Sequence, residues 1–234
     1  MKKETANAET VFGIDVSRHQ GNIDWKRVSN AGARFVFMKA TEGATWVDPK
    51  FYTNWHQAKT NGIIRGVYHF FRPHSPVDGK VDNLVSTVGA LEAGDLPPVL
   101  DIEVPESWRS LSLARRVKIV QDWLDGVEQG LGIKPIIYLS PSFADEILEN
   151  TGQFDSYLLW LAHYTSRPQP RTPKPWADWT FWQYSETGRV DGISGNVDMN
   201  RFNGSIDDLI QLTVQSSALC NCKCTCCADC ASNK

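Results

Sequence analysis

The sequence contains no cysteine before Cys220. The main part of the chain can therefore hold neither a disulfide nor a metal site built on thiolates. It also lacks a Gly-x-Ser-x-Gly nucleophile elbow, a His-x-x-x-His metal pair, and a glycine-rich phosphate loop after its first apolar segment. These absences argue against a serine or cysteine nucleophile, a metal centre and a nucleotide cofactor, and we expect no cofactor.

Long apolar runs and blocks of positive charge are missing as well. No stretch approaches the roughly 20 apolar residues of a membrane span, and the formal net charge of -3 comes without a Lys/Arg cluster. We therefore expect neither an integral membrane segment nor a nucleic-acid partner. The first ten residues are polar and show no secretory signal. This predicts synthesis in the cytoplasm and, for a target outside the membrane, another route of exit.

The chain does contain a series of short apolar segments that mostly alternate with helical patterns. Strands are predicted at residues 11–17, 34–40, 63–71, 99–103, 135–139, 158–163, 179–184 and 197–202. Helices are predicted at residues 22–31, 49–61, 77–93, 111–129, 142–150 and 205–214. This order favours an α/β fold, an irregular (β/α) TIM-like barrel of eight parallel strands with reduced helices in the last turns. A doubly wound open sheet is the alternative.

The barrel is expected to span residues 11–215. A polar extension, residues 1–10, precedes it, and a cysteine-rich tail, residues 216–234, follows it. We expect the protein to be a monomer.

Two acids close the fourth predicted strand, where Asp101 and Glu103 are separated only by Ile102. Residues at i and i+2 of a strand point to the same face, so the two carboxyls are expected to project together. Neighbouring carboxyls do not both ionise easily, and such a pair can supply one proton donor and one anion at the same pH. Acid-x-acid pairs are also common at solvated strand edges, so the pair needs further context.

That context comes from the other strand ends. In a barrel of this type, functional residues lie at the carboxyl ends of different strands. The polar residues found there are Asp15, Lys39, His69, Asp101, Glu103, Tyr138, His163, Gln183 and Asp198. Each has a structural alternative, and the two histidines could simply be core residues. Four acids from three strands are harder to explain structurally, because repulsion and desolvation both oppose their gathering.

Carboxylates combined with aromatic side chains are typical of glycoside hydrolysis, in which one acid protonates the leaving oxygen and another stabilises or attacks the anomeric centre. The aromatic residues that could stack on sugar rings are Tyr68, Phe70, Tyr138, Trp160, Trp182 and Tyr184. A cation site is the competing use of such acids, but no histidine pair accompanies them.

The sequence resembles the family 25 glycoside hydrolases, the lysozymes of phages, bacteria and some fungi. The resemblance runs from Gly13 to Phe202 in a series of ordered blocks. The blocks are Gly13-Ile14-Asp15-Val16-Ser17 with His19-Gln20-Gly21, Phe37-Met38-Lys39-Ala40-Thr41-Glu42-Gly43, Gly66-Val67-Tyr68-His69-Phe70, Val99-Leu100-Asp101-Ile102-Glu103, Leu159-Trp160-Leu161-Ala162-His163-Tyr164, Trp182-Gln183-Tyr184-Ser185 and Val197-Asp198-Met199-Asn200-Arg201-Phe202.

The resemblance implies cleavage of the β-1,4 bond between N-acetylmuramic acid and N-acetylglucosamine in peptidoglycan glycan strands. It also implies that Glu103 is the proton donor, that Asp101 is its partner, and that Asp15 and Asp198 are the other acids of the site. Asp101 could act as a nucleophile, as a base for water, or as an orienter of the substrate's acetamido group. We favour the last, which gives net retention. Phage-type release through a membrane lesion made by another protein, a holin, would bring the enzyme to the wall.

Two other functions stay open at this point: a non-catalytic saccharide-binding barrel and a hydrolase of another N-acetylated polymer such as chitin. The tail does not belong to the family pattern. Its cysteines, Cys220, Cys222, Cys224, Cys226, Cys227 and Cys230, could bind a soft metal, form disulfides or carry acyl groups, or the tail could have no role.

Overall fold

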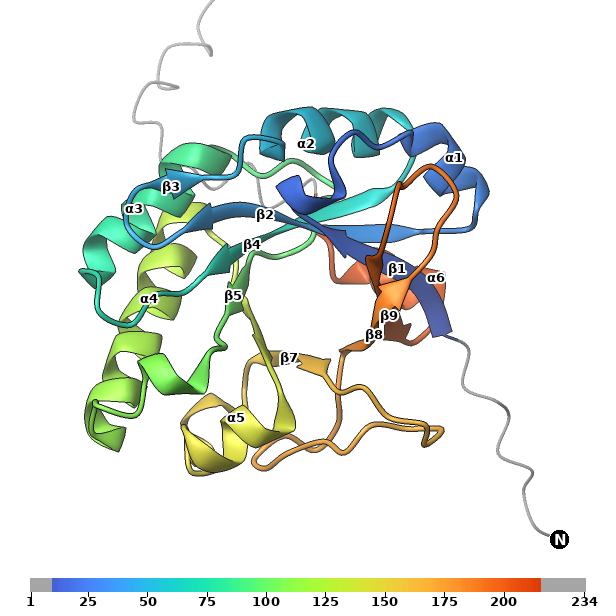
Figure 1. Cartoon of the computed structure of the whole chain (residues 1–234). Coiled ribbons are helices and arrows are strands. Elements are labelled where there is room, and N and C mark those ends of the chain that lie inside the picture. Colours follow the sequence, from blue (N-terminus) through green and yellow to red (C-terminus); the bar gives the residue numbers. More distant parts are fainter. Residues whose placement is uncertain (1–9, 216–234) are drawn as a thin grey trace, which may run out of the picture.

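A computed structural model describes residues 10–215. The candidate metal-binding cysteines of the tail, and all but the last residue of the predicted extension, therefore lie outside the described residues. One sheet forms the centre of the molecule (Figure 1). Its strands are β1 (Thr10–Val16), β2 (Phe35–Glu42), β3 (Trp46–Val47), β4 (Ile64–Phe70), β5 (Val99–Asp101), β6 (Ile136–Leu139), β7 (Leu158–Ala162), β8 (Phe181–Gly188) and β9 (Val197–Asn203).

The α-helices of this part of the chain lie around the sheet (Figure 1). They are α1 (Trp25–Asn30), α2 (Phe51–Thr60), α3 (Val77–Val88), α4 (Leu113–Leu131), α5 (Pro141–Glu146) and α6 (Ile206–Gln211), with short 3₁₀ helices at η1 (Arg18–Gln20), η2 (Pro105–Ser107) and η3 (Gly152–Phe154). None of the helices between residues 10 and 215 is long and apolar enough to cross a bilayer.

Pairing between β1 and β2 closes the sheet into a barrel. The strands follow the order β1-β9-β8-β7-β6-β5-β4-β2, and β1 pairs with β2 as well as with β9. The short strand β3 lies outside this ring and only extends β2 as an antiparallel hairpin. The predicted eight-stranded α/β barrel is confirmed, and a doubly wound open sheet is excluded.

The prediction that all eight barrel strands run parallel is wrong for β9, which is antiparallel to both β1 and β8. Only residues 189–196 connect β8 to β9, and a parallel crossover needs a dozen residues or more. The chain therefore returns directly as a hairpin. Residues 163–180, between β7 and β8, also contain no helix. The reduced helices predicted for the last turns are thus confirmed.

Side chains alternate between the inside and the outside of the barrel, because a strand has a period of two residues. The inward side chains form an aromatic core in which the Phe37 ring stacks on Trp160, with centroids 4.6 Å apart, and meets Phe181 edge-on at 5.0 Å. Outward residues pack beneath the helices in a separate cluster. Leu209 of α6 joins the inner core, so α6 helps to close one end of the barrel.

Gly66 on β4 provides space for this aromatic core. It pairs with Phe37 in the β2–β4 register. A Cβ atom at Gly66 would lie 2.6 Å from the Phe37 ring and 3.0 Å from the Cβ of Leu96. Real side chains do not tolerate such distances, so glycine is required here for packing.

We predict that Gly66→Ala lowers the free energy of unfolding by about 1–3 kcal/mol, because overpacking forces the Phe37 ring out of its position. The midpoint of urea denaturation measures the change. Gly152→Ala is the matched control: a Cβ there meets nothing within 4 Å, and the expected change is within about 0.5 kcal/mol. Equal stabilities of the two variants would contradict the packing argument.

Candidate active site

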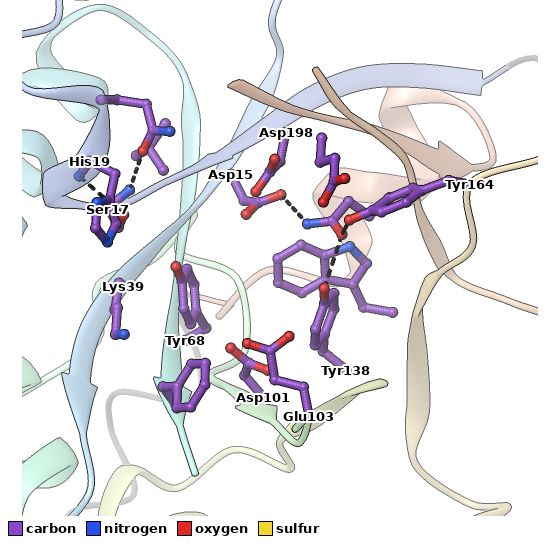
Figure 2. Close-up of a pocket in the computed structure, with 16 residues that line it drawn as sticks. Asp15, Ser17, His19, Lys39, Tyr68, Asp101, Glu103, Tyr138, Tyr164 and Asp198 are labelled. Carbon is purple, nitrogen blue, oxygen red and sulfur yellow. Dashed lines mark hydrogen bonds between the residues drawn. The ribbon is translucent and has the colours of Figure 1, made fainter. Parts of the chain in front are cut away.

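A cavity of about 370 Å³ opens at the end of the barrel where the parallel strands finish. All four acids predicted from the sequence line it (Figure 2). Asp15 comes from β1, Asp101 is the last residue of β5, Glu103 lies two residues further on, and Asp198 comes from β9. Because β9 is antiparallel, its first residues reach the same end of the barrel as the last residues of its neighbours.

The chain turns sharply after Glu103. Val104 adopts φ 60° and ψ 69°, a left-handed conformation that a β-branched residue rarely takes. Such a backbone costs about 1–3 kcal/mol and persists only where its surroundings impose it. Trp108, itself fully buried, donates from Nε1 to the Glu103 carbonyl at 3.1 Å. This turn holds the backbone that presents Glu103 to the cavity.

Asp15 is held by a network of hydrogen bonds that crosses the barrel. Its Oδ2 accepts from Gln183 Nε2 at 2.9 Å and from Asn200 Nδ2 at 2.7 Å. Gln183 Oε1 in turn accepts from the hydroxyls of Tyr138 and Tyr164, at 2.9 and 2.8 Å. The network fixes the carboxyl of Asp15 and the orientation of both amides.

Asp198 lies directly opposite Asp15 in the β1–β9 register, and the two carboxyls face each other (Figure 2). Burial raises the pKa of Asp15 well above its usual range, and the charge of Asp198 raises it further. Burial also raises the pKa of Asp198, although a hydrogen bond from Asp15 opposes this rise. Burial thus favours a neutral carboxyl in this pair, and the mutual repulsion of two negative charges on Asp15 and Asp198 opposes full ionisation.

Asp101 and Glu103 form the second pair, on the other side of the cavity (Figure 2). Burial raises the pKa of Asp101 well above its usual range, and the charge of Glu103 adds to the effect. Burial also raises the pKa of Glu103, whereas the nearby charges of Lys39 and Arg72 lower it. Asp101 Oδ1 is buried and has no hydrogen-bond partner among residues 10–215. A proton donor that enters the cavity would satisfy it.

Three charged side chains border this second pair. Lys39 Nζ donates to Glu42 Oε2 at 2.6 Å, and Arg72 pairs with Glu42 Oε1 at 2.7 Å. Both cations lie 4.4 Å from the centroid of the Phe70 ring. Partial burial would raise the pKa of Glu42, but the hydrogen bonds from both cations lower it overall. Glu42 thus stays charged and holds the two cations in place.

Six of the ten predicted substrate-binding residues line the cavity: Lys39, Tyr68, Phe70, Tyr138, Trp160 and Gln183. The other four do not. His69 is fully buried on the outer side of β4, stacked on Trp123, with its Nδ1 bonded to Thr41. Its place is structural, because the inward neighbours Tyr68 and Phe70 put it on the opposite face.

The same alternation of side chains places the remaining three residues on the outer face of the barrel. Trp182 and Tyr184 flank the inward Gln183 and pack against each other outside the barrel. Ala162 packs against the inner core, so the next residue, His163, points to the outer face. There its Nδ1 accepts a hydrogen bond from the backbone N–H of Arg171. These residues do not line the cavity, for a reason already visible in the period of the strands.

Several cavity residues were not among the predicted site residues: Val16, Ser17, His19, Gln20, Tyr164 and Glu186. Ser17 caps the 3₁₀ helix η1, its Oγ accepting from the backbone of His19, and so directs this turn to the cavity rim. Glu186 lies three residues after Gln183, yet both line the cavity, because the β8–β9 register shifts between them. Extending the search into the loops after each strand would have found His19 and Tyr164.

An α/β barrel with two carboxyl pairs in its mouth, one of them supported by cations, belongs to the class of enzymes that work by proton transfer and charge stabilisation. Comparison with known proteins narrows this class. The model of the family "Glycosyl hydrolases family 25" matches residues 14–193. The chain belongs to this family and is a glycoside hydrolase, as the sequence blocks predicted.

Individual relatives are similar in sequence to this chain over most of its length. YegX of Escherichia coli is 42% identical over 205 residues, covering 86% of this chain and 72% of that protein. Lysozyme M1 of Streptomyces globisporus is 38% identical, covering 88% of this chain and 72% of that protein. The crystal structure of the bacterial lysozyme from Streptomyces coelicolor matches with a TM-score of 0.83 at 36% identity, covering 90% of this chain and 98% of that one.

The raised pKa of Asp101 predicts that Asp101→Asn stabilises the protein while impairing catalysis. A carboxyl whose pKa is higher in the folded than in the unfolded state costs stability as pH rises from about 4 towards the folded value. Asparagine does not titrate, so the gain should be larger at pH 7, where about 1 kcal/mol is expected, than at pH 4. Urea denaturation at both pH values measures it.

Asp155→Asn is the control for this experiment, because Asp155 is exposed on the surface. It should leave the denaturation midpoint unchanged at either pH. A gain for Asp101→Asn that is the same at pH 4 and pH 7 would contradict the assigned cause.

Proposed function

We propose that this glycoside hydrolase is a lysozyme that cleaves the β-1,4 bond between N-acetylmuramic acid and N-acetylglucosamine in peptidoglycan. The observation that carries the proposal is the Asp101–Glu103 pair, which faces a cavity lined by aromatic and amide side chains. Relatives support it: a protein 38% identical is named Lysozyme M1, and a structure 36% identical is titled a bacterial lysozyme.

Glu103 serves as the general acid in this proposal. Its carboxyl is partly buried, and its raised pKa keeps a larger fraction protonated at a given pH than an exposed glutamate would be. The proton passes to the glycosidic oxygen as the bond to the anomeric carbon breaks. The aglycone then leaves as a neutral alcohol, and positive charge develops on the sugar ring.

Asp101 orients the substrate rather than attacking it. The acetamido oxygen of the sugar attacks the anomeric carbon, and the N–H of the same group donates to the unpartnered Asp101 Oδ1. Hydrogen bonding to a carboxylate favours its charged form. Burial raises the pKa of both Asp101 and Glu103 in the free enzyme. The hydrogen bond from the substrate lowers the pKa of Asp101 and so favours a proton on Glu103, where the reaction needs it.

The second half of the reaction reverses these roles. Glu103, now a carboxylate, takes a proton from water, and the water oxygen attacks the anomeric carbon from the face that the leaving group vacated. The acetamido oxygen is released and the sugar keeps its original β configuration. Two displacements therefore give net retention.

We predict that Glu103→Gln lowers kcat on purified bacterial walls by about 10²–10⁴-fold, because proton donation to the leaving oxygen is lost. A turbidity assay gives the rate, and mass spectrometry of borohydride-reduced fragments identifies the new reducing end, expected to be muramic acid. Binding of a glycan fragment, measured by calorimetry, should persist. Glu106→Gln, an exposed acid nearby, is the matched control and should retain wild-type turnover.

Full activity of the Glu103→Gln variant would show that another residue donates the proton. Reducing ends made of glucosamine would instead indicate an enzyme that acts on a different bond or polymer. Fragments that bind without being cleaved by the wild type would indicate a saccharide-binding barrel.

The stereochemical course gives a separate prediction. Proton NMR of the first product released from a defined oligosaccharide should show the β anomer before mutarotation. An initial α anomer would mean that water attacks directly, and would contradict substrate assistance.

A further inference from the structure

A second cavity, of about 580 Å³, adjoins the acidic one and shares His19, Lys39 and Phe70 with it. Figure 2 shows His19 and Lys39 on the same side of the acidic cavity, where the second cavity begins. We call this second cavity the basic groove. It extends along η1 and the β2–β3 hairpin, past Arg18 and Trp46, to Arg72.

The solvent-facing charge of the basic groove is positive. Its two acids are already used: Glu42 is paired with Lys39 and Arg72, and the buried Asp48 accepts from the backbone N–H groups of Arg18 and Lys50. The side chain of Arg72 remains 44% exposed. Arg18 is exposed, and its guanidinium makes no ion pair with any residue in the described part of the chain.

The aromatic rings of the groove contact these cations. The Arg18 guanidinium and Lys39 Nζ lie 5.2 and 5.1 Å from the centroid of the Trp46 ring. Such contacts hold a cation over a ring face. The Asp48 bond fixes the backbone of Arg18 at the same time. The groove therefore presents a positioned guanidinium with free donors, which matches the geometry of a carboxylate.

We propose that the basic groove binds a carboxylate of the peptide carried by the lactyl group of N-acetylmuramic acid, with Arg18 as the specificity-determining residue. The inference rests on the proposed function, because that substrate places an acidic peptide beside the glycan held in the acidic cavity. Continuity of the two cavities lets one substrate fill both. The glycosidic bond that is cleaved then lies in the acidic cavity, and the peptide carboxylate that is recognised lies in the basic groove.

The test compares two substrates that differ only in charge. Both are muramyl tetrasaccharides bearing L-alanyl-D-glutamate; in one the glutamate carboxyls are free, and in the other they are amidated. Wild-type enzyme should prefer the free acid in kcat/KM. Arg18→Gln should lower kcat/KM for the free acid about fivefold, the equivalent of roughly 1 kcal/mol for an exposed ion pair. The amidated substrate should change less than about twofold.

Two further measurements sharpen the result. Calorimetry in the inactive Glu103→Gln background should show the same loss of affinity for the free acid when Arg18→Gln is added, independent of turnover. The matched control is Arg34→Gln, which changes an exposed arginine just before β2, at the opposite end of the barrel. It removes the same charge and should keep the wild-type preference.

Equal kcat/KM of the wild type for the two substrates would overturn the inference and leave the lysozyme function standing. So would an Arg18→Gln variant that loses activity equally on both, since the groove would then bind glycan and not the carboxylate. Failure of the wild type to cleave either substrate would overturn the proposed function itself, and the inference with it.

Discussion

The hydrogen bonds that converge on Asp15 connect the barrel strands at the point where the interior changes from apolar to polar. Trp160 of β7 donates from its indole to Asn200 of β9, at 2.8 Å, and Asn200 donates to Asp15 of β1. Gln183 of β8 links Asp15 to Tyr138 of β6. Each of these hydrogen bonds joins residues on two different strands. The acidic mouth therefore rests on a hydrogen-bonded layer, and Trp160 belongs to both the aromatic core and this polar layer.

Gathering four acids in this mouth is costly, and the structure limits that cost in two ways. In the pair of Asp15 and Asp198, burial raises both pKa values and so favours a neutral carboxyl, and two side-chain amides donate to Asp15. The other pair lies near Lys39 and Arg72, whose charges oppose the rise in the pKa of Glu103. Glu42 positions both cations without neutralising them fully. The strained turn at Val104 adds a backbone cost beside Glu103. Such costs are typical of active sites, where function and stability make opposite demands.

Much of the site followed from one rule, that functional residues lie where barrel strands end. The rule led correctly to Asp15, Asp101 and Glu103 as cavity residues, and to Lys39, Tyr138 and Gln183 beside them. Asp198 lies at the start of its strand and lines the cavity because β9 runs antiparallel to its neighbours. The rule also led to His69 and His163, which do not line the cavity, and neither do Trp182 and Tyr184, which were chosen as aromatic side chains. In all four cases, position along a strand was considered without the face to which each residue points. For His69, the neighbours Tyr68 and Phe70 already occupied the inward face, so strict alternation would have corrected the error.

Other features depend on long-range pairing, and local sequence carries no signal for them. The sequence alone determined the order of strands and helices, because hydrophobic periodicity and turn residues are local properties. It also determined that Asp15, Asp101 and Glu103 lie at or just beyond the ends of their strands. Only the tertiary structure decided that β9 closes the barrel antiparallel, and that a register shift in β8 turns Glu186 inward. It alone decided that η1 and the β2–β3 hairpin bring Arg18 and Trp46 together beside the acidic cavity. Those outcomes depend on pairing between residues far apart in the chain, which the closed barrel imposes on all of its strands at once.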